Sequence, residues 1–119
     1  MVLNPKSEVR EVQGVASDQM MLIRAFIQGA VYSWVKNRKG EWFAVRDLAG
    51  GENFDWNGTP LQTLFDKHVK GGKPPTDAIE AAGRDIGWIT KSVLSEDKRT
   101  FEADNSGYVS QYRWAGNEP

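Results

Sequence analysis

The chain has 119 residues, the size of one ordinary domain. Hydrophobic residues make up 39% of it and aromatic residues 11%, so it can bury a core, which excludes a wholly disordered protein. The 15 basic and 16 acidic residues nearly cancel, at a formal net charge of −1. Dedicated nucleic-acid binders are usually strongly basic, so this balance argues mildly against one. No apolar run exceeds four residues, as in Met20 to Ile23, so we expect no membrane partner.

The chain contains no cysteine. Disulfides, thiolate catalysis and thiolate metal sites are therefore excluded, and the composition fits a reducing compartment. The N-terminal segment has Lys6 and Arg10 but no apolar stretch typical of a secretory signal. We therefore expect a cytoplasmic protein.

The charges are distributed unevenly along the chain. Residues 47–66 include four acidic residues and no basic one, which gives −4. Residues 67–99 include seven basic and five acidic residues, which gives +2. The second segment is the one that we expect to face an anion, because local charge governs such contacts more than the total does.

The chain begins with a segment that lacks regular periodicity. Residues 1–16 show no convincing helical or strand period, and we expect a disordered or loosely docked N-terminal arm. Ser17 or Asp18 is a suitable N-cap for a first helix, which should end near Asn37. Apolar residues recur at helical spacing along it, and the expected inner stripe is Ile23, Phe26, Ile27, Ala30, Val31, Trp34 and Val35.

The next segment predicts short elements and a second helix. Residues 41–45 are aromatic and β-branched, typical of a brief strand, and residues 46–49 can form one helical turn. Thr59 as N-cap, with Pro60 in the first helical position, starts a helix that ends at Gly71. Its expected apolar face is Leu61, Leu64, Phe65 and His68.

A long third helix follows two prolines. Asp77, or alternatively Thr76, is the expected cap, and the glycines at 83 and 87 either permit close helix approach or mark a bend. The expected buried stripe is Ile79, Ala82, Ile86, Ile89 and Val93. The expected outer face is Arg84, Trp88, Lys91 and Ser95.

The last segment predicts a β-hairpin. Residues 99–103 and 108–114 alternate in polarity, and residues 104–107 have turn chemistry. The side chains expected to face the core are Phe101, Tyr112 and Trp114. Those expected to face solvent are Thr100, Glu102, Gln111 and Arg113.

This order of helix, strand, two helices and hairpin predicts an α+β fold of the winged-helix type, in which a three-helix core carries a hairpin wing. Residues 86–94 resemble the recognition-helix segment of the regulatory factor X type of winged helix. Residues 98–99 match the basic pair that enters its wing, and residues 110–116 resemble its closing strand. Primase-helicase C-terminal winged helices are similar. We expect the domain to span residues 17–116, with a tail at 117–119.

The resemblance implies binding to duplex DNA by a non-catalytic accessory or regulatory protein, without a cofactor. Family members that read DNA with the wing carry arginines there, whereas this wing has Glu102 and Asp104, so contacts to the phosphate backbone are expected instead of wing insertion. The candidate DNA-binding residues are Arg84, Trp88, Lys91, Ser92, Lys98, Arg99, Asn105, Gln111 and Arg113. We expect the hairpin to lie against the long helix, so that their cations form a single ridge. In the structural alternative, the helix cations are ordinary solvated residues and the hairpin only closes the core.

Other functions remain open at this point. Trp88 or the acidic segment 47–66 can dock a protein partner, which gives a protein-interaction module of the same fold. A third choice is a metal-dependent nuclease that uses Asp77, Glu96 and Lys98. Residues 53–58 match the opening of a calcium loop, but Leu64 stands where its bidentate glutamate is required, so we expect a turn and no metal site. We expect His68 to be a packed or half-buried residue and not a catalytic base.

Overall fold

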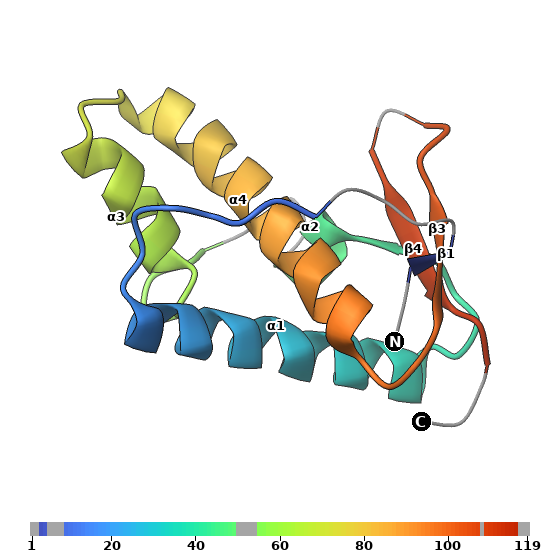
Figure 1. Ribbon diagram of the computed structural model, residues 1–119. Coiled ribbons are helices and arrows are strands. Elements are labelled where there is room, and N and C mark those ends of the chain that lie inside the picture. Colours follow the sequence, from blue (N-terminus) through green and yellow to red (C-terminus); the bar gives the residue numbers. More distant parts are fainter. Residues whose placement is uncertain (1–2, 5–8, 50–54, 108, 117–119) are drawn as a thin grey trace.

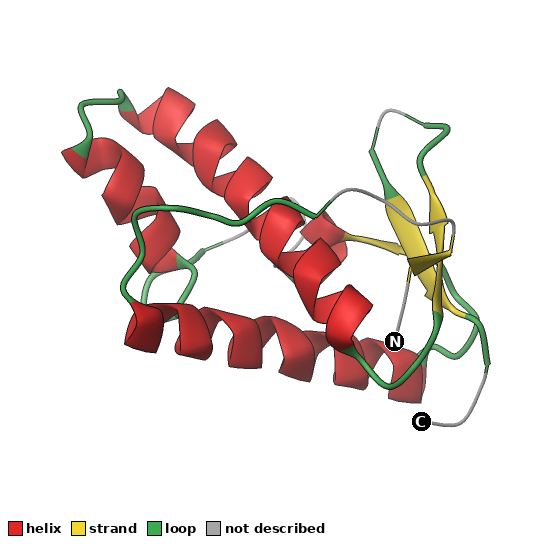
Figure 2. Cartoon of the chain, viewed as in Figure 1, coloured by secondary structure: helices red, strands yellow, loops and turns green. Residues whose placement is uncertain are grey.

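A computed structural model gives the fold and describes residues 3–4, 9–49, 55–107 and 109–116. Helices and strands occupy separate parts of the molecule (Figure 2), so the fold is α+β, as the sequence predicts. In chain order, the elements are β1 (Leu3–Asn4), α1 (Ser17–Asn37), β2 (Phe43–Ala44), α2 (Val45–Leu48), α3 (Gln62–Lys70), α4 (Pro75–Glu96), β3 (Phe101–Asp104) and β4 (Gln111–Trp114).

The first long helix, α1, has the bounds that the sequence predicts. Its buried side chains, four residues apart, are Ile23, Ile27, Val31 and Val35. Two details of the prediction are wrong. Ala16 occupies the N-cap position and Ser17 already lies in the first turn. Phe26 is 37% exposed, because it lies outside the narrow sector that faces the core.

The strand after α1 is shorter than the sequence predicts, and the helical turn that follows begins one residue earlier. The strand is limited to β2, because the chain turns into α2 at Val45. The backbone N–H of Ala44 donates a hydrogen bond to Oδ2 of Asp47 at 2.8 Å. This acidic side chain therefore stabilises the change from strand to helix.

Both later helices begin at positions that differ from the prediction. Oγ1 of Thr59 accepts a hydrogen bond from the backbone N–H of Leu61 at 3.2 Å. Thr59 therefore caps a turn that precedes the helix, and α3 begins at Gln62. In contrast, α4 begins at Pro75, earlier than the predicted caps at Thr76 or Asp77. Proline at the first helical position has no N–H, so it removes one of the donors that lack a partner at this end of the helix.

The long helix α4 continues to Glu96 and forms a helical hairpin with α3 before it crosses α1 (Figure 1). A Cβ placed on Gly83 or Gly87 meets no atom within 4 Å, so these glycines do not serve close helix approach. Ile79, expected in the buried stripe, is 36% exposed. The side chains of α4 that are buried are Ala78, Ala81, Ala82, Ile86, Ile89, Thr90, Val93 and Leu94.

The sheet has four strands in the order β1-β3-β4-β2. The predicted hairpin is present as the antiparallel pair β3–β4, and β2 adds to β4 in antiparallel orientation. Tyr108, at the start of the predicted second strand, lies outside the described residues. The sequence did not predict β1, which places part of the arm parallel to β3.

Three aromatic rings join the sheet to the helices. Phe43 of β2, Phe101 of β3 and Tyr112 of β4 are all buried. The ring centroid of Phe43 lies 6.3 Å from that of Phe101 and 6.0 Å from that of Tyr112. They share one hydrophobic core with the inner stripes of α1 and α4, and Trp114 is partly buried against it. Burial of these rings fixes which face of the hairpin points inward.

The buried Tyr112 makes stability sensitive to high pH. Burial raises the pKa of its hydroxyl, and a hydrogen bond with Ser110 only partly offsets the effect. Because the folded state favours the neutral phenol, the contribution of Tyr112 to the free energy of unfolding should be constant below about pH 10 and should fall at higher pH. In Tyr112→Phe this loss should be smaller. Denaturant unfolding between pH 8 and pH 11 measures it, and equal losses in the two proteins would contradict the assignment.

Candidate functional site

The predicted DNA-binding residues are spread over three parts of the structure. Four lie on α4, two lie in the connection to β3, and three lie on the hairpin. In that order they are Arg84, Trp88, Lys91, Ser92, Lys98, Arg99, Asn105, Gln111 and Arg113. Their surroundings decide which of them are available to a ligand.

Cations gather around Trp88 on the outer face of α4. The guanidinium carbon of Arg10 lies 4.9 Å from the centre of the Trp88 ring, and Nζ of Lys91 lies 5.0 Å from it. Arg84 is exposed one helical turn before Trp88, on the same face. We call Arg10, Arg84, Trp88 and Lys91 the Trp88 patch. An aromatic ring between cations is a suitable surface for phosphate groups and bases.

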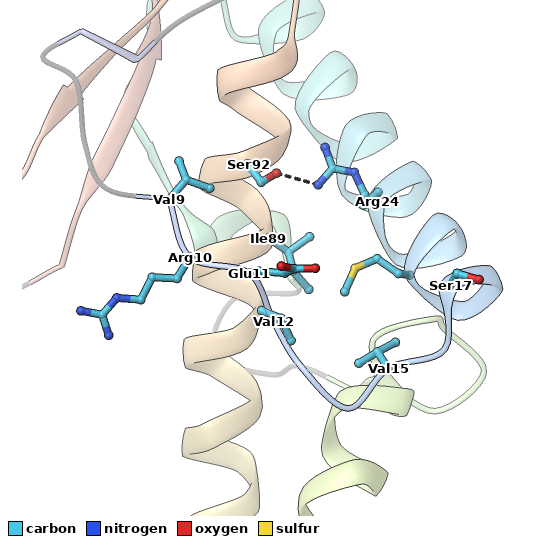
Figure 3. A pocket seen from close by; sticks show the side chains of 10 residues that line it. Val9, Arg10, Glu11, Val12, Val15, Ser17, Arg24, Ile89 and Ser92 are labelled. Atoms are coloured by element: carbon cyan, nitrogen blue, oxygen red, sulfur yellow. Dashed lines mark hydrogen bonds between the residues drawn. The ribbon is translucent and has the colours of Figure 1, made fainter.

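The N-terminal arm supplies one of the three cations of this patch. Figure 3 shows residues 9–15 crossing α4, with the side chain of Arg10 directed away from α1. Val12 and Val15 pack against the hydrophobic core and hold the arm in place. Gly14 has φ +79°, a conformation that favours glycine, and lets the arm turn beside Lys67. The arm therefore contributes to the candidate site.

Arg99 and Arg113 do not join the Trp88 patch. Arg99 lies over the ring of Tyr32 on α1, at 4.8 Å, and its Nη1 is 3.5 Å from Oδ1 of Asp97. Arg113 is on the outer face of the hairpin, where its Nη2 is 2.8 Å from Glu102. The expected single ridge of cations is therefore not formed, because carboxylates and aromatic rings on different faces hold these two side chains.

The polar candidates have mostly internal partners. The hydroxyl of Ser92 accepts a hydrogen bond from Nη1 of Arg24 at 2.7 Å. Oδ1 of Asn105 accepts one from the hydroxyl of Ser110, also at 2.7 Å. Gln111 and Lys98 are exposed. These bonds assign Ser92 to the contact between α1 and α4, and Asn105 to the hairpin turn.

The hairpin turn carries negative charge. The hydroxyl and the backbone N–H of Ser106 both donate to Oδ1 of Asp104, at 2.5 and 2.9 Å. These bonds lower the pKa of Asp104 from its ordinary value. The carboxylate is therefore ionised at neutral pH, and an approaching phosphate would be repelled by this turn.

A pocket of about 450 Å³ lies between the arm, α1 and α4 (Figure 3). The bond from Arg24 to Ser92 lies at one end, and Arg24 also pairs with Glu96. The pocket wall combines apolar residues with both charges: Val9, Arg10, Glu11, Val12, Val15, Ser17, Met20, Arg24, Ile89 and Ser92. Because it offers no concentrated charge of one sign, this pocket is less suited to an anion than the Trp88 patch.

His68 takes part in a charged network that joins α3 to α4. Oδ2 of Asp85 lies 2.8 Å from Nε2 of His68 and 2.8 Å from Nζ of Lys67. Lys67 also donates to the backbone carbonyl of Gln13 at 2.8 Å. The side chain of His68 is 17% exposed, so the expectation of a half-buried residue is confirmed. The network attaches the arm to the two helices.

The third choice, a nuclease site, has no assembled set of carboxylates in the part of the chain that is described. Asp77 is in the first turn of α4 and Glu96 is its last residue. At 1.5 Å per residue, they are separated by roughly 28 Å. No group of three or more His, Asp or Glu side chains among the described residues is placed to hold a metal ion. In the proposed turn at 53–58, Asn53 lies outside those residues, and Asp55 accepts the N–H of Asn57 at 3.0 Å.

Comparisons with protein-family models, curated proteins and solved structures found no significant match to this chain. Among the described helices, none has the length and apolar character needed to cross a membrane. The site must therefore be interpreted from its own geometry.

Sequence reasoning missed two site residues. Arg10 was noted only as an N-terminal charge, and it reaches Trp88 across 78 positions of sequence. Arg24 lies off the predicted apolar stripe of the first helix, and the structure shows that it bridges to Ser92 and Glu96 of α4. No local pattern indicates either contact, because periodicity reports only which face of one helix is apolar.

Removal of the Asp85 carboxylate should destabilise the fold. Asp85→Asn leaves the Lys67 ammonium group, which is only 19% exposed, without its counter-charge. We expect the free energy of unfolding to fall by about 2 kcal/mol. Chemical denaturation measures the effect.

Glu80→Gln is the matched control, because it removes an exposed carboxylate from the same helix and should change stability by less than about 0.5 kcal/mol. Similar losses in the two variants would contradict the role of the network.

Proposed function

We propose that the protein is a winged-helix domain, with α1, the α2–α3 segment and α4 as its helical core and β3–β4 as its wing. The succession of helices and strands supports this proposal, since β2 follows α1 and the hairpin follows the last helix. The antiparallel pairing of β2 with β4 also supports it, because this pairing attaches the base of the hairpin to the helical core. Residues 86–94, which resemble the recognition-helix segment of the regulatory factor X type, then lie on α4, the third core helix.

The preferred function is that of a non-catalytic, cytoplasmic accessory or regulatory protein that binds duplex DNA. The observation that carries this proposal is the Trp88 patch, in which Arg10 and Lys91 lie within about 5 Å of one aromatic ring. Arg84 extends the positive charge along α4. Three cations on one face are suited to consecutive phosphates, and Trp88 is suited to stacking or groove contact.

The patch also limits how DNA can approach. Asp77 and Glu80 lie on the same face of α4, nearer to its N-terminus. Phosphates are therefore favoured only over the C-terminal half of the helix, beside the arm. The ionised Asp104 disfavours the wing turn. We accordingly place DNA across α4 and the arm, with the wing at the edge of the contact.

The second candidate is a protein-interaction module of the same fold. The ion pairs of Arg99 and Arg113 favour it, because they remove two of the cations expected to contact DNA. Trp88, flanked by Arg10, is also a typical centre for a protein interface. In the acidic segment, Asp47 caps α2, whereas Glu52 lies outside the described residues.

The salt dependence of binding to a random duplex separates the two candidates. Because contact with about three phosphates releases counterions, the logarithm of the association constant should fall against log salt with a slope of about −3. The triple variant Arg10→Ala, Arg84→Ala and Lys91→Ala should bring this slope close to zero. Fluorescence anisotropy of a labelled duplex, from about 20 to 200 mM salt, measures it.

The matched control is Arg38→Ala, Lys39→Ala and Arg46→Ala, which removes three exposed cations outside the patch. It has the same net charge as the test variant and should keep the parent slope. Equal slopes for the test variant and the parent would reject the Trp88 patch as the DNA site. If the parent binds no duplex even at the lowest salt, DNA binding itself is rejected and the protein-interaction candidate is favoured.

A further inference from the structure

The outer side of α1 is apolar although no described element covers it. Eight large hydrophobic residues of the described chain are exposed, and four of these are on this one helix. They are Met21, Leu22, Phe26 and Tyr32, exposed by 71%, 56%, 37% and 48%. Ala25 and Gly29, also exposed, lie between them at helical spacing. We call these six residues the outer face of α1.

None of the six residues of this outer face is charged, although the guanidinium carbon of Arg99 lies 4.8 Å from the centre of the Tyr32 ring at one end of the face. The only charged residue between Asp18 and Lys36 is Arg24, and it is directed to Ser92 and Glu96 of α4. A surface helix of a monomeric protein normally has charged residues opposite its core stripe. Figure 1 shows α3 and α4 on one side of α1. At 100° per residue, the outer face lies opposite the buried stripe of α1 that faces the core. This helix therefore has two apolar faces. One is buried in the core, and the other is exposed.

The two ends of the outer face carry opposite charges. Asp18 is exposed in the first turn of α1, and Lys36 is exposed in its last turn. At 100° per residue, these two side chains point in the same direction as the middle of the outer face. The face is therefore complementary to its own copy in reverse orientation.

We propose that a second copy of this chain docks on the outer face, with the two α1 helices antiparallel about a two-fold axis that passes between Ala25 and Gly29. In that arrangement Asp18 meets the partner's Lys36, twice by symmetry. Ala25 meets the partner's Gly29 at the crossing point, and their small size permits close approach of the helices. Leu22 meets the partner's Tyr32 on either side, which buries the large apolar groups.

Antiparallel orientation distinguishes this arrangement from its alternatives. Parallel helices would place Asp18 beside the partner's Asp18 and Lys36 beside the partner's Lys36, which repel each other. Antiparallel helices also align their dipoles favourably. The contact runs over about 27 Å of helix, which is small for a permanent dimer. We therefore expect a reversible dimer with a Kd on the order of 10 μM.

The first test places a charge at the crossing point. An added Cβ at Gly29 meets no atom within 4 Å in the monomer, so Gly29→Glu should fold normally. In the dimer it would bury a carboxylate against the partner's Ala25, and dimerisation should weaken at least about 100-fold. Gly83→Glu is the matched control, since Gly83 is also helical, exposed and free of neighbours within 4 Å. It should dimerise as the parent does.

Sedimentation velocity between about 1 and 300 μM, without DNA, measures the association. The proposal requires a concentration-dependent dimer for the parent and for Gly83→Glu, and a monomer for Gly29→Glu. A parent that stays monomeric throughout this range overturns it, and so does an unchanged dimer of Gly29→Glu. Circular dichroism of the variants confirms that a lost dimer does not reflect unfolding. Because no DNA is present, the result is independent of the DNA-binding proposal.

A charge-reversal experiment tests the orientation. Asp18→Lys alone and Lys36→Asp alone should each weaken the dimer about tenfold, because each creates two repulsive pairs. An equimolar mixture of the two variants should restore association as a heterodimer, since one copy then has two lysines and the other two aspartates. Failure of the mixture to associate better than either variant would overturn the antiparallel arrangement.

Discussion

The fold depends on burial of one continuous apolar seam between α1, α4 and the base of the hairpin. The four-residue stripe of α1 and the stripe of α4 belong to the same core as Phe43, Phe101 and Tyr112. Because these rings come from three different strands, the short sheet can form only where the helices already supply an apolar surface. A strand of two residues, such as β2, has little stability of its own. The position of the hairpin, and hence of its charges, follows from this packing.

Packing also decides which cations are available. Arg99 and Arg113 lie beside aromatic rings and carboxylates that the same fold brings to them. In the Trp88 patch, Arg10 and Lys91 lie beside one aromatic ring on the outer face of α4. A net charge of −1 is therefore compatible with a local anion-binding surface. On this view the arm is part of the binding surface, since it contributes Arg10.

Sequence reasoning predicted the elements that depend on local periodicity. The bounds of α1, the burial of Leu64 on α3 and the inward direction of Phe101 and Tyr112 follow from apolar spacing, and the structure confirms them. It did not predict β1, the contact of Arg10 with Trp88, or the ion pair of Arg113 with Glu102. These features join segments far apart in sequence or directly across a hairpin, and their geometry is set by the tertiary packing. The winged-helix assignment and the DNA-binding function stay predictions.

The most direct test of the central claim is a titration of the isotopically labelled protein with a short DNA duplex, followed by NMR. The indole N–H of Trp88 and the backbone amides around Arg10, Arg84 and Lys91 should show the largest shifts, while those of the hairpin turn at 104–107 should change little. Shifts concentrated in that turn, or spread evenly over the molecule, would contradict the account.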